Sequence, residues 1–154
     1  MAAAVLAVAI AAPVHADPNP WPNIRLFEQL DPLTLTVPGA DGLWFTAPSG
    51  QNCGIWGPGS FACAGDIPGA PPGTTAVGWV AGDRAVHYDW TIGFRMPKTT
   101  AAAVIAPRSS VTHNGTTCAV ADDARTYCER GPMKFMIAPE GTWITPPWMD
   151  LSRR

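Results

Sequence analysis

The chain has 154 residues, a net charge of -2 and only 14% charged residues, against 47% apolar ones. No run of like charge is longer than Asp122-Asp123, so the chain lacks the basic surface that binds nucleic acids or anionic membranes. Its 17 Pro, 15 Gly and seven Trp argue against long helices and against disorder, and favour one packed domain of strands joined by many turns.

Residues 1–16 have the pattern of an export signal. An apolar run from Ala2 to Ala12 is followed by Pro13 and by Val14-His15-Ala16, which places small residues where a signal peptidase cuts. The run is much shorter than the roughly 20 residues that span a bilayer. We therefore expect a cleaved signal and a secreted or cell-envelope protein whose mature chain begins at Asp17 and has no membrane span, although the usual positively charged start is missing.

Residues 17–42 are predicted to form an extended arm, a short helix and a first strand. The arm, residues 17–22, is stiffened by three prolines. Asn23 is suited to cap a helix over residues 24–30, which Asp31-Pro32 would end, and residues 33–37 alternate apolar and polar side chains as a half-buried strand does.

A ten-residue step between cysteines occurs twice, from Cys53 to Cys63 and from Cys118 to Cys128, and each step opens with Gly-x-x-Cys-x-(Ile or Val). Directly opposed residues of an antiparallel pair lie within the Cα separation that a disulfide accepts. We therefore predict two hairpins, each closed by its own disulfide, in an oxidising compartment. Zinc sites use much closer ligand spacing, so no metal is expected.

Residues 43–148 are predicted to form a β domain with an internal hairpin repeat, and residues 149–154 a polar tail. Asn114-Gly115 is the strongest hairpin signal in the chain, and Gly57-Pro58-Gly59 forms the tip of the first cysteine hairpin. Because Cys118 follows Cys53 by 65 residues, the repeat suggests two similar lobes of sheet. The predicted fold is all-β, a small antiparallel sandwich or open barrel of about seven to nine strands.

Residues 76–81 and 85–96 are predicted to be paired strands joined by a turn at Gly82-Asp83. Alternate positions of the second strand are apolar, so Trp90 is expected in the core, as is Trp79 of the first strand, and the polar side chains are expected on the opposite face. That face would present His87, Asp89 and Arg95, an imidazole, an acid and a base, as a candidate ligand platform or, if no loops wall it in, as a solvated face with Arg95 close to Asp89.

Several of these runs resemble a group of small exported actinobacterial, mainly mycobacterial, proteins of unknown function. The likeness covers roughly residues 43–147 and implies an exported protein with paired-cysteine hairpins, but no catalytic residue. It rests on Phe45-Thr46-Ala47-Pro48-Ser49-Gly50 with Cys53 after it, Cys63-Ala64-Gly65-Asp66-Ile67-Pro68-Gly69, Asn114-Gly115-Thr116-Thr117-Cys118-Ala119-Val120 and Thr126-Tyr127-Cys128.

Catalytic constellations are weakly represented. Ser49 is the one serine in a tight turn, no Gly-x-Ser-x-Gly motif is present, and acids such as Asp66 and Glu140 are scattered. A His87/Asp89 metal site would need a third ligand, for which His113 is the candidate. No catalytic residue and no cofactor are therefore assigned, and an enzyme is the less favoured reading.

Three functions stay open. The first is a non-enzymatic cell-envelope or extracellular protein that binds a protein or glycan partner. The second is a carbohydrate- or envelope-binding module that uses exposed tryptophans such as Trp21, Trp56 or Trp148, although such turn tryptophans more often fold back onto a core. The third is a small secreted hydrolase using Ser49 or the His87/Asp89 pair. The ligand-binding candidates are His87, Asp89, Arg95 and Trp56.

Overall fold

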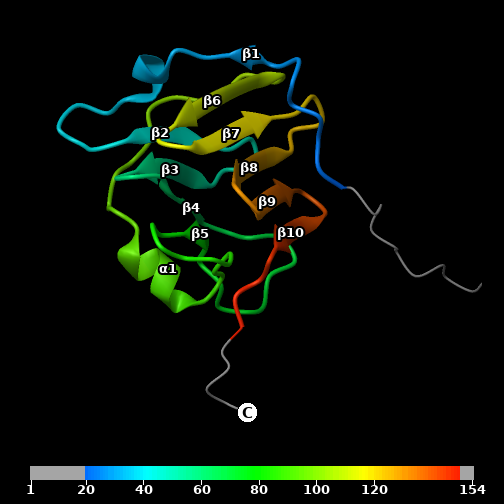
Figure 1. Ribbon diagram of the computed structural model, residues 1–154. Helices are drawn as coiled ribbons and strands as arrows, with labels where there is room; N and C mark the ends of the chain where they lie inside the picture. Colours follow the sequence, from blue (N-terminus) through cyan, green and yellow to red (C-terminus); the bar gives the residue numbers. More distant parts are fainter. Residues whose placement is uncertain (1–19, 150–154) are drawn as a thin grey trace, which may run out of the picture.

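The computed structural model describes residues 20–149 of the protein (Figure 1). The expected signal peptide, the start of the arm and the end of the tail lie outside these residues. Two sheets pack face to face, so of the two architectures expected the sandwich is right. The first sheet has the order β2-β3-β4-β5 and consists of β2 (Leu43–Thr46), β3 (Asn52–Trp56), β4 (Ser60–Ala64) and β5 (Ala76–Trp79).

The second sheet has the order β1-β6-β7-β8-β9-β10. Its members are β1 (Glu28–Gln29), β6 (Ser109–His113), β7 (Thr116–Val120), β8 (Thr126–Arg130), β9 (Met133–Ala138) and β10 (Gly141–Thr145). All pairs in this sheet are antiparallel except β1 with β6, which is parallel. The hairpin predicted at Asn114-Gly115 joins β6 to β7, and both turn residues have the positive φ that such a turn requires.

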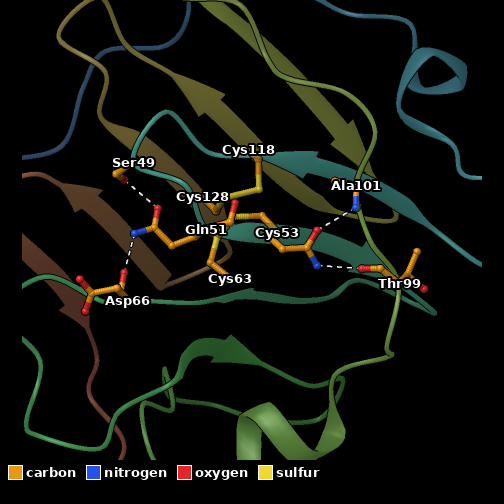
Figure 2. Close-up of a disulfide and its surroundings, with 10 residues drawn as sticks. Ser49, Gln51, Cys53, Cys63, Asp66, Thr99, Ala101, Cys118 and Cys128 are labelled. Atoms are coloured by element: carbon orange, nitrogen blue, oxygen red, sulfur yellow. Dashed lines mark hydrogen bonds between the residues drawn. A yellow bond between two sulfur atoms is a disulfide. The ribbon is translucent and has the colours of Figure 1, made fainter.

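Both predicted disulfides are present, and each lies in a different sheet. The Cα atoms are 4.0 Å apart in Cys53–Cys63 and 4.1 Å apart in Cys118–Cys128, because each pair occupies directly opposed positions of a hairpin. Figure 2 shows the two bridges in the interior between the sheets. Each bridge is flanked in register by one aromatic residue and one valine, which gives the rows Phe45–Cys53–Cys63–Val77 and Val111–Cys118–Cys128–Phe135.

The two residues before Cys53 fasten neighbouring loops to the first hairpin (Figure 2). The buried Gln51 amide donates to the Asp66 carbonyl (2.6 Å) and accepts from the Ser49 hydroxyl (2.7 Å). The Asn52 side chain accepts from the Ala101 amide (2.8 Å) and donates to the carbonyl of Thr99, 47 residues away (2.7 Å). The start of the cysteine repeat is thus a structural junction.

The predictions for residues 24–37 are wrong. In place of a helix over residues 24–30, a turn leads into β1, and in place of a strand over residues 33–37 there is a 3-10 helix, η1 (Pro32–Leu35). Asp31 caps η1, since its carboxylate accepts from the Leu33 amide, and a proline suits the first turn of a helix. The Asp-Pro pair therefore begins a helical turn where it was expected to end one.

The long strand predicted over residues 85–96 is also wrong. Only its first part joins the sheet, where His87 and Gly78 exchange two backbone hydrogen bonds of 2.8 and 2.9 Å after the predicted turn at Gly82. The chain then enters a short helix, α1 (Trp90–Arg95), which lies beside β5 (Figure 1).

Apolar residues at every second position predict a strand, but they also include pairs four residues apart. Residues i and i+4 share one face of a helix, so the same pattern is compatible with a helix. Ile92 and Met96 use that spacing to pack on the outer face of the four-stranded sheet, in a cluster with Trp44. Trp90 and Phe94 have the same spacing on the other side and are 76% and 81% exposed. Trp90 is therefore not a core residue, whereas Trp79 is fully buried as expected.

The segment after β10 connects the two sheets at one side. Val86 donates to the Pro146 carbonyl (2.8 Å) and accepts from the Trp148 amide (2.9 Å), which forms a parallel bridge with Pro147. The end of the described chain therefore packs beside residues 86–89. Two of the candidate ligand-binding residues, His87 and Asp89, lie in this segment, and a third, Arg95, lies close by. No helix within residues 20–149 has the length and apolar character needed to cross a membrane.

Candidate functional site

His87 lies at the centre of a polar cluster, but it is buried and does not face solvent as expected. Its Nε2 is 3.5 Å from Asp83 Oδ2 and its Nδ1 is 3.6 Å from Asp89 Oδ1. The Trp148 ring stacks on the imidazole, with centroids 4.9 Å apart and planes 23° apart. The fold therefore brings His87 and Asp89 together, though through a turn and a helix start, not through one face of a strand.

Arg95 joins the same cluster through a different partner from the one expected. Its Nη2 is 3.3 Å from Asp83 Oδ2, a carboxylate that also accepts from the Val80 amide at 2.8 Å. Asp89 instead accepts from the Thr91 hydroxyl at 2.6 Å. Asp83 is thus the residue that sequence reasoning missed. Its place in the Gly82-Asp83 turn marked it as a turn residue but gave no sign that it would meet both His87 and Arg95.

His87 Nδ1 is enclosed and makes no hydrogen bond in the described part of the molecule. The ring is held by one indole and two carboxylates, which makes it a link between the C-terminal segment and the turn after β5. Within residues 20–149, no group of three or more His, Cys, Asp or Glu side chains is arranged to hold a metal ion.

Beside this cluster, α1 presents an exposed aromatic pair. The Trp90 and Phe94 rings meet edge to face, with centroids 6.5 Å apart. A groove of about 320 Å³ runs from Trp90 along Asp89 and Tyr88 to Pro71 and Pro72. We call Trp90, Phe94 and this groove the α1 aromatic surface.

Trp56, the fourth ligand-binding candidate, belongs to another part of the fold. It is half-buried and stacks on Trp44, with centroids 6.1 Å apart and planes only 10° apart. Trp44 in turn lies flat over Gly54, where any side chain would overlap its ring. Trp56 therefore extends the packing on the outer face of the four-stranded sheet, and its stack with Trp44 follows the expectation that turn tryptophans fold back.

The residues considered for hydrolysis are separate. The Ser49 hydroxyl donates to Gln51, and no hydrogen bond in residues 20–149 connects it to a histidine. Asp66 supplies its backbone carbonyl to Gln51, and Glu140 pairs with Arg125 at 3.0 Å. His113 lies at the end of β6 beside Asn114. These side chains do not converge on one reactive position.

A second candidate site lies on the outer face of the six-stranded sheet, where residues 21–25 cross it. Trp21 packs on the buried Tyr127, with ring centroids 5.8 Å apart and planes 42° apart. A cavity of about 450 Å³ adjoins the two rings and is also lined by Glu129 and Lys134. Sequence reasoning missed these three sheet residues, although alternation about Cys128 places Tyr127 and Glu129 together on the outer face.

Tyr127 and Glu129 are directly coupled. The Tyr127 hydroxyl donates to the Glu129 carboxylate. Burial raises the pKa of Tyr127 far above its ordinary value, and the hydrogen bond to Glu129 and that carboxylate's negative charge raise it further. The phenol therefore stays protonated and holds one carboxylate oxygen of Glu129.

Comparison of the chain with protein-family models, with curated proteins and with solved structures found no match.

Proposed function

We propose that the protein is an exported, non-enzymatic binding protein of the cell envelope or the extracellular space, and that it binds a protein partner through the α1 aromatic surface. The observation that carries this proposal is the exposure of Trp90 and Phe94, at 76% and 81%, side by side on one short helix. Clustered exposed apolar side chains usually mark an interaction site.

The helix that carries the aromatic pair is anchored to the sheet, which favours binding. Ile92 and Met96 pack against the sheet from the buried side of α1. Gly93 faces Thr75 and Ala76, so this side of the helix lies against the start of β5. A partner that covers Trp90 and Phe94 would therefore bury large rings on a backbone that is already in place, so little backbone conformational entropy is lost.

The surroundings of the pair fit the usual anatomy of a protein interface, in which aromatic anchors are surrounded by polar groups. Asp89 and Arg95 flank the rings in sequence, and both are partly exposed. The groove toward Pro71 and Pro72 is shallow and open, a shape suited to a side chain or an extended segment of another protein.

Export is supported by the two disulfides, which persist in oxidising compartments. The export pattern in residues 1–16 and the resemblance to small exported actinobacterial proteins support the same location. The non-enzymatic part is supported by Ser49, whose hydroxyl is engaged by Gln51, and by His87, whose ring is covered by Trp148.

Site-specific crosslinking tests the proposal. A photoreactive benzoylphenylalanine replaces Phe94 in one sample and Leu33, which is 74% exposed on η1, in the matched control. Both are irradiated in envelope and culture-fluid extracts of the organism that encodes the chain. We expect one protein to be crosslinked from position 94 and not from position 33. Excess unlabelled wild-type protein should compete with this crosslink, and Trp90→Ala protein should not.

The identified partner then allows a quantitative test. Loss of an interface anchor of this kind weakens binding by about 30-fold or more, so we expect at least that effect from Trp90→Ala and no change from Leu33→Ala. Equal crosslinking from both positions, or full competition by the Trp90→Ala protein, would contradict the proposal. Sedimentation with lipid vesicles that depends on Trp90 would also contradict it, because the surface would then bind a membrane.

A further inference from the structure

The outer face of the six-stranded sheet carries a cavity whose lining differs from that of the α1 aromatic surface. It lies between the segment that contains Trp21, Asn23 and Arg25 and the adjacent strands β8 and β9, which contribute Tyr127, Glu129 and Lys134. Its volume of about 450 Å³ falls within the range of sites for small molecules, about 300 to 1,000 Å³. Two aromatic rings, two cations, one carboxylate and one amide therefore border one open pocket.

The charged side chains that line this cavity do not form ion pairs with one another. Glu129 and Lys134 are directly opposed across β8 and β9, where opposite charges usually pair. The Glu129 carboxylate instead accepts from Tyr127. Within residues 20–149, neither Lys134 nor Arg25 forms an ion pair with a carboxylate. Two cations and one carboxylate give the lining a net positive charge, which favours an anionic ligand.

The remaining groups indicate what kind of anion fits. The Trp21 ring, held against Tyr127 at 5.8 Å, offers an apolar π-face at the border of the cavity. The C–H face of a pyranose ring is apolar and its rim carries hydroxyls. Glu129 can accept from such hydroxyls, and the Asn23 amide can both donate and accept. An inorganic anion would use the cations and leave the aromatic wall without a partner.

We propose that this cavity binds a pyranose sugar that carries a carboxylate, with the ring on Trp21, its hydroxyls on Glu129 and Asn23, and its carboxylate on Lys134 and Arg25. The site lies on the sheet that does not carry α1, and it is independent of the proposed protein partner. Tyr127 acts as a positioning residue, because its hydroxyl fixes the carboxylate of Glu129.

The test uses two glycosides that differ only at C6, methyl galacturonoside with a carboxylate and methyl galactoside with a hydroxymethyl group, and inorganic phosphate as a third probe. Binding is followed by calorimetry and by amide chemical shifts of the full chain. We expect the acidic glycoside to shift resonances of β8, β9 and residues 21–25, and to bind about tenfold or more tightly than the neutral one, because a charge-assisted contact contributes about that factor. Phosphate should bind more weakly than the acidic glycoside.

Variants separate the roles of the residues. Lys134→Met, which keeps the apolar stem, should lower the affinity for the acidic glycoside toward that for the neutral one, because only Arg25 then remains to hold the carboxylate. Trp21→Ala should weaken both by about tenfold, since stacking on an aromatic ring contributes to each. Lys98→Met, an exposed lysine next to another pocket, is the matched charge control and should change nothing. Trp90→Ala should also leave both affinities unchanged.

Several outcomes would overturn the proposal. Equal affinity for the two glycosides, or unchanged binding by the Lys134→Met protein, would remove the role of the cations. Phosphate binding as tight as that of the acidic glycoside would identify a simple anion site. If the folded wild-type protein does not bind the acidic glycoside at millimolar concentration, the proposed sugar site does not exist. The crosslinking test at position 94 concerns a different surface, so its result would not be affected.

Discussion

The buried hydroxyl of Thr116 donates to the carbonyl oxygen of Gly59, 2.7 Å away, although the two residues are 57 positions apart. Trp79 Nε1 donates to the same oxygen at 3.1 Å, and the Asn114 amide donates to the Gly57 carbonyl at 2.6 Å. The tip of the first cysteine hairpin is thus bound to the start of β7, in the sheet of the second cysteine hairpin. The second residue of the second Gly-x-x-Cys motif therefore has a structural role.

We expect Thr116→Val to lower the free energy of unfolding by about 1 kcal/mol. The substitution keeps the shape of the side chain and removes one buried donor, while Gly59 retains its hydrogen bond from Trp79. Urea unfolding measures the change. Thr100→Val, at an exposed position, is the control and should have almost no effect. An equal effect of the two substitutions would mean that the hydrogen bond to Gly59 does not stabilise the fold.

Two tryptophans that the sequence grouped together should behave in opposite ways. Trp79→Ala should destabilise the protein by about 3 to 5 kcal/mol, because the ring is fully buried against Phe61. Trp90→Ala should change the free energy of unfolding by less than about 0.5 kcal/mol, since its ring is exposed. Urea unfolding of both variants decides the matter, and similar losses would contradict the burial of Trp79 and exposure of Trp90.

Removal of either disulfide should destabilise the fold without changing its architecture. Each bridge closes a loop with a sequence separation of 10 residues, for which the chain-entropy account gives about 2 to 3 kcal/mol. We expect that loss in the paired variants Cys53→Ala/Cys63→Ala and Cys118→Ala/Cys128→Ala, measured by urea unfolding. Because both bridges belong to one core, their effects should not be additive. An unchanged unfolding midpoint would show that the bridge contributes nothing.

Stability should fall in alkaline solution because of Tyr127. Its pKa in the folded protein is raised above the ordinary value by burial first, and then by the hydrogen bond and charge of Glu129. Above about pH 10 the unfolded chain releases this proton while the folded protein retains it, so the free energy of unfolding decreases as pH rises. The contribution is fully present below that pH. In Tyr127→Phe the alkaline decrease, measured by urea unfolding, should be smaller, and an identical pH dependence would contradict the assignment.

Local signals were sufficient to predict the hairpins. Asn114-Gly115 favours a tight turn whatever surrounds it, and the spacing of Cys53 and Cys63 across a two-stranded ribbon places them opposite each other. Met133, Phe135 and Ile137 show the same alternation, and there the chain forms a strand, because β8 and β10, its neighbours in sequence, pair with it on both sides.

The same reasoning failed where one pattern fits two structures. In residues 85–96, apolar side chains at every second position are compatible with a strand and, through pairs four residues apart, with a helix. The helix forms because Ile92 and Met96 can then be buried on the outer face of the four-stranded sheet. For residues 24–35, the Asp31-Pro32 signal was read in the wrong direction, and pairing of β1 with β6 required a strand about 80 residues away in the chain.

The sequence by itself determined the all-β class, the two disulfide-closed hairpins and most of the turns, because these depend on neighbours within one hairpin. Only the tertiary structure decided which side chains meet from distant segments. Asp83 reaches Arg95 because a turn and a helix end converge, and Trp21 reaches Tyr127 because the N-terminal segment crosses the sheet. Such contacts depend on how whole elements pack, and neither local propensity nor spacing encodes that packing.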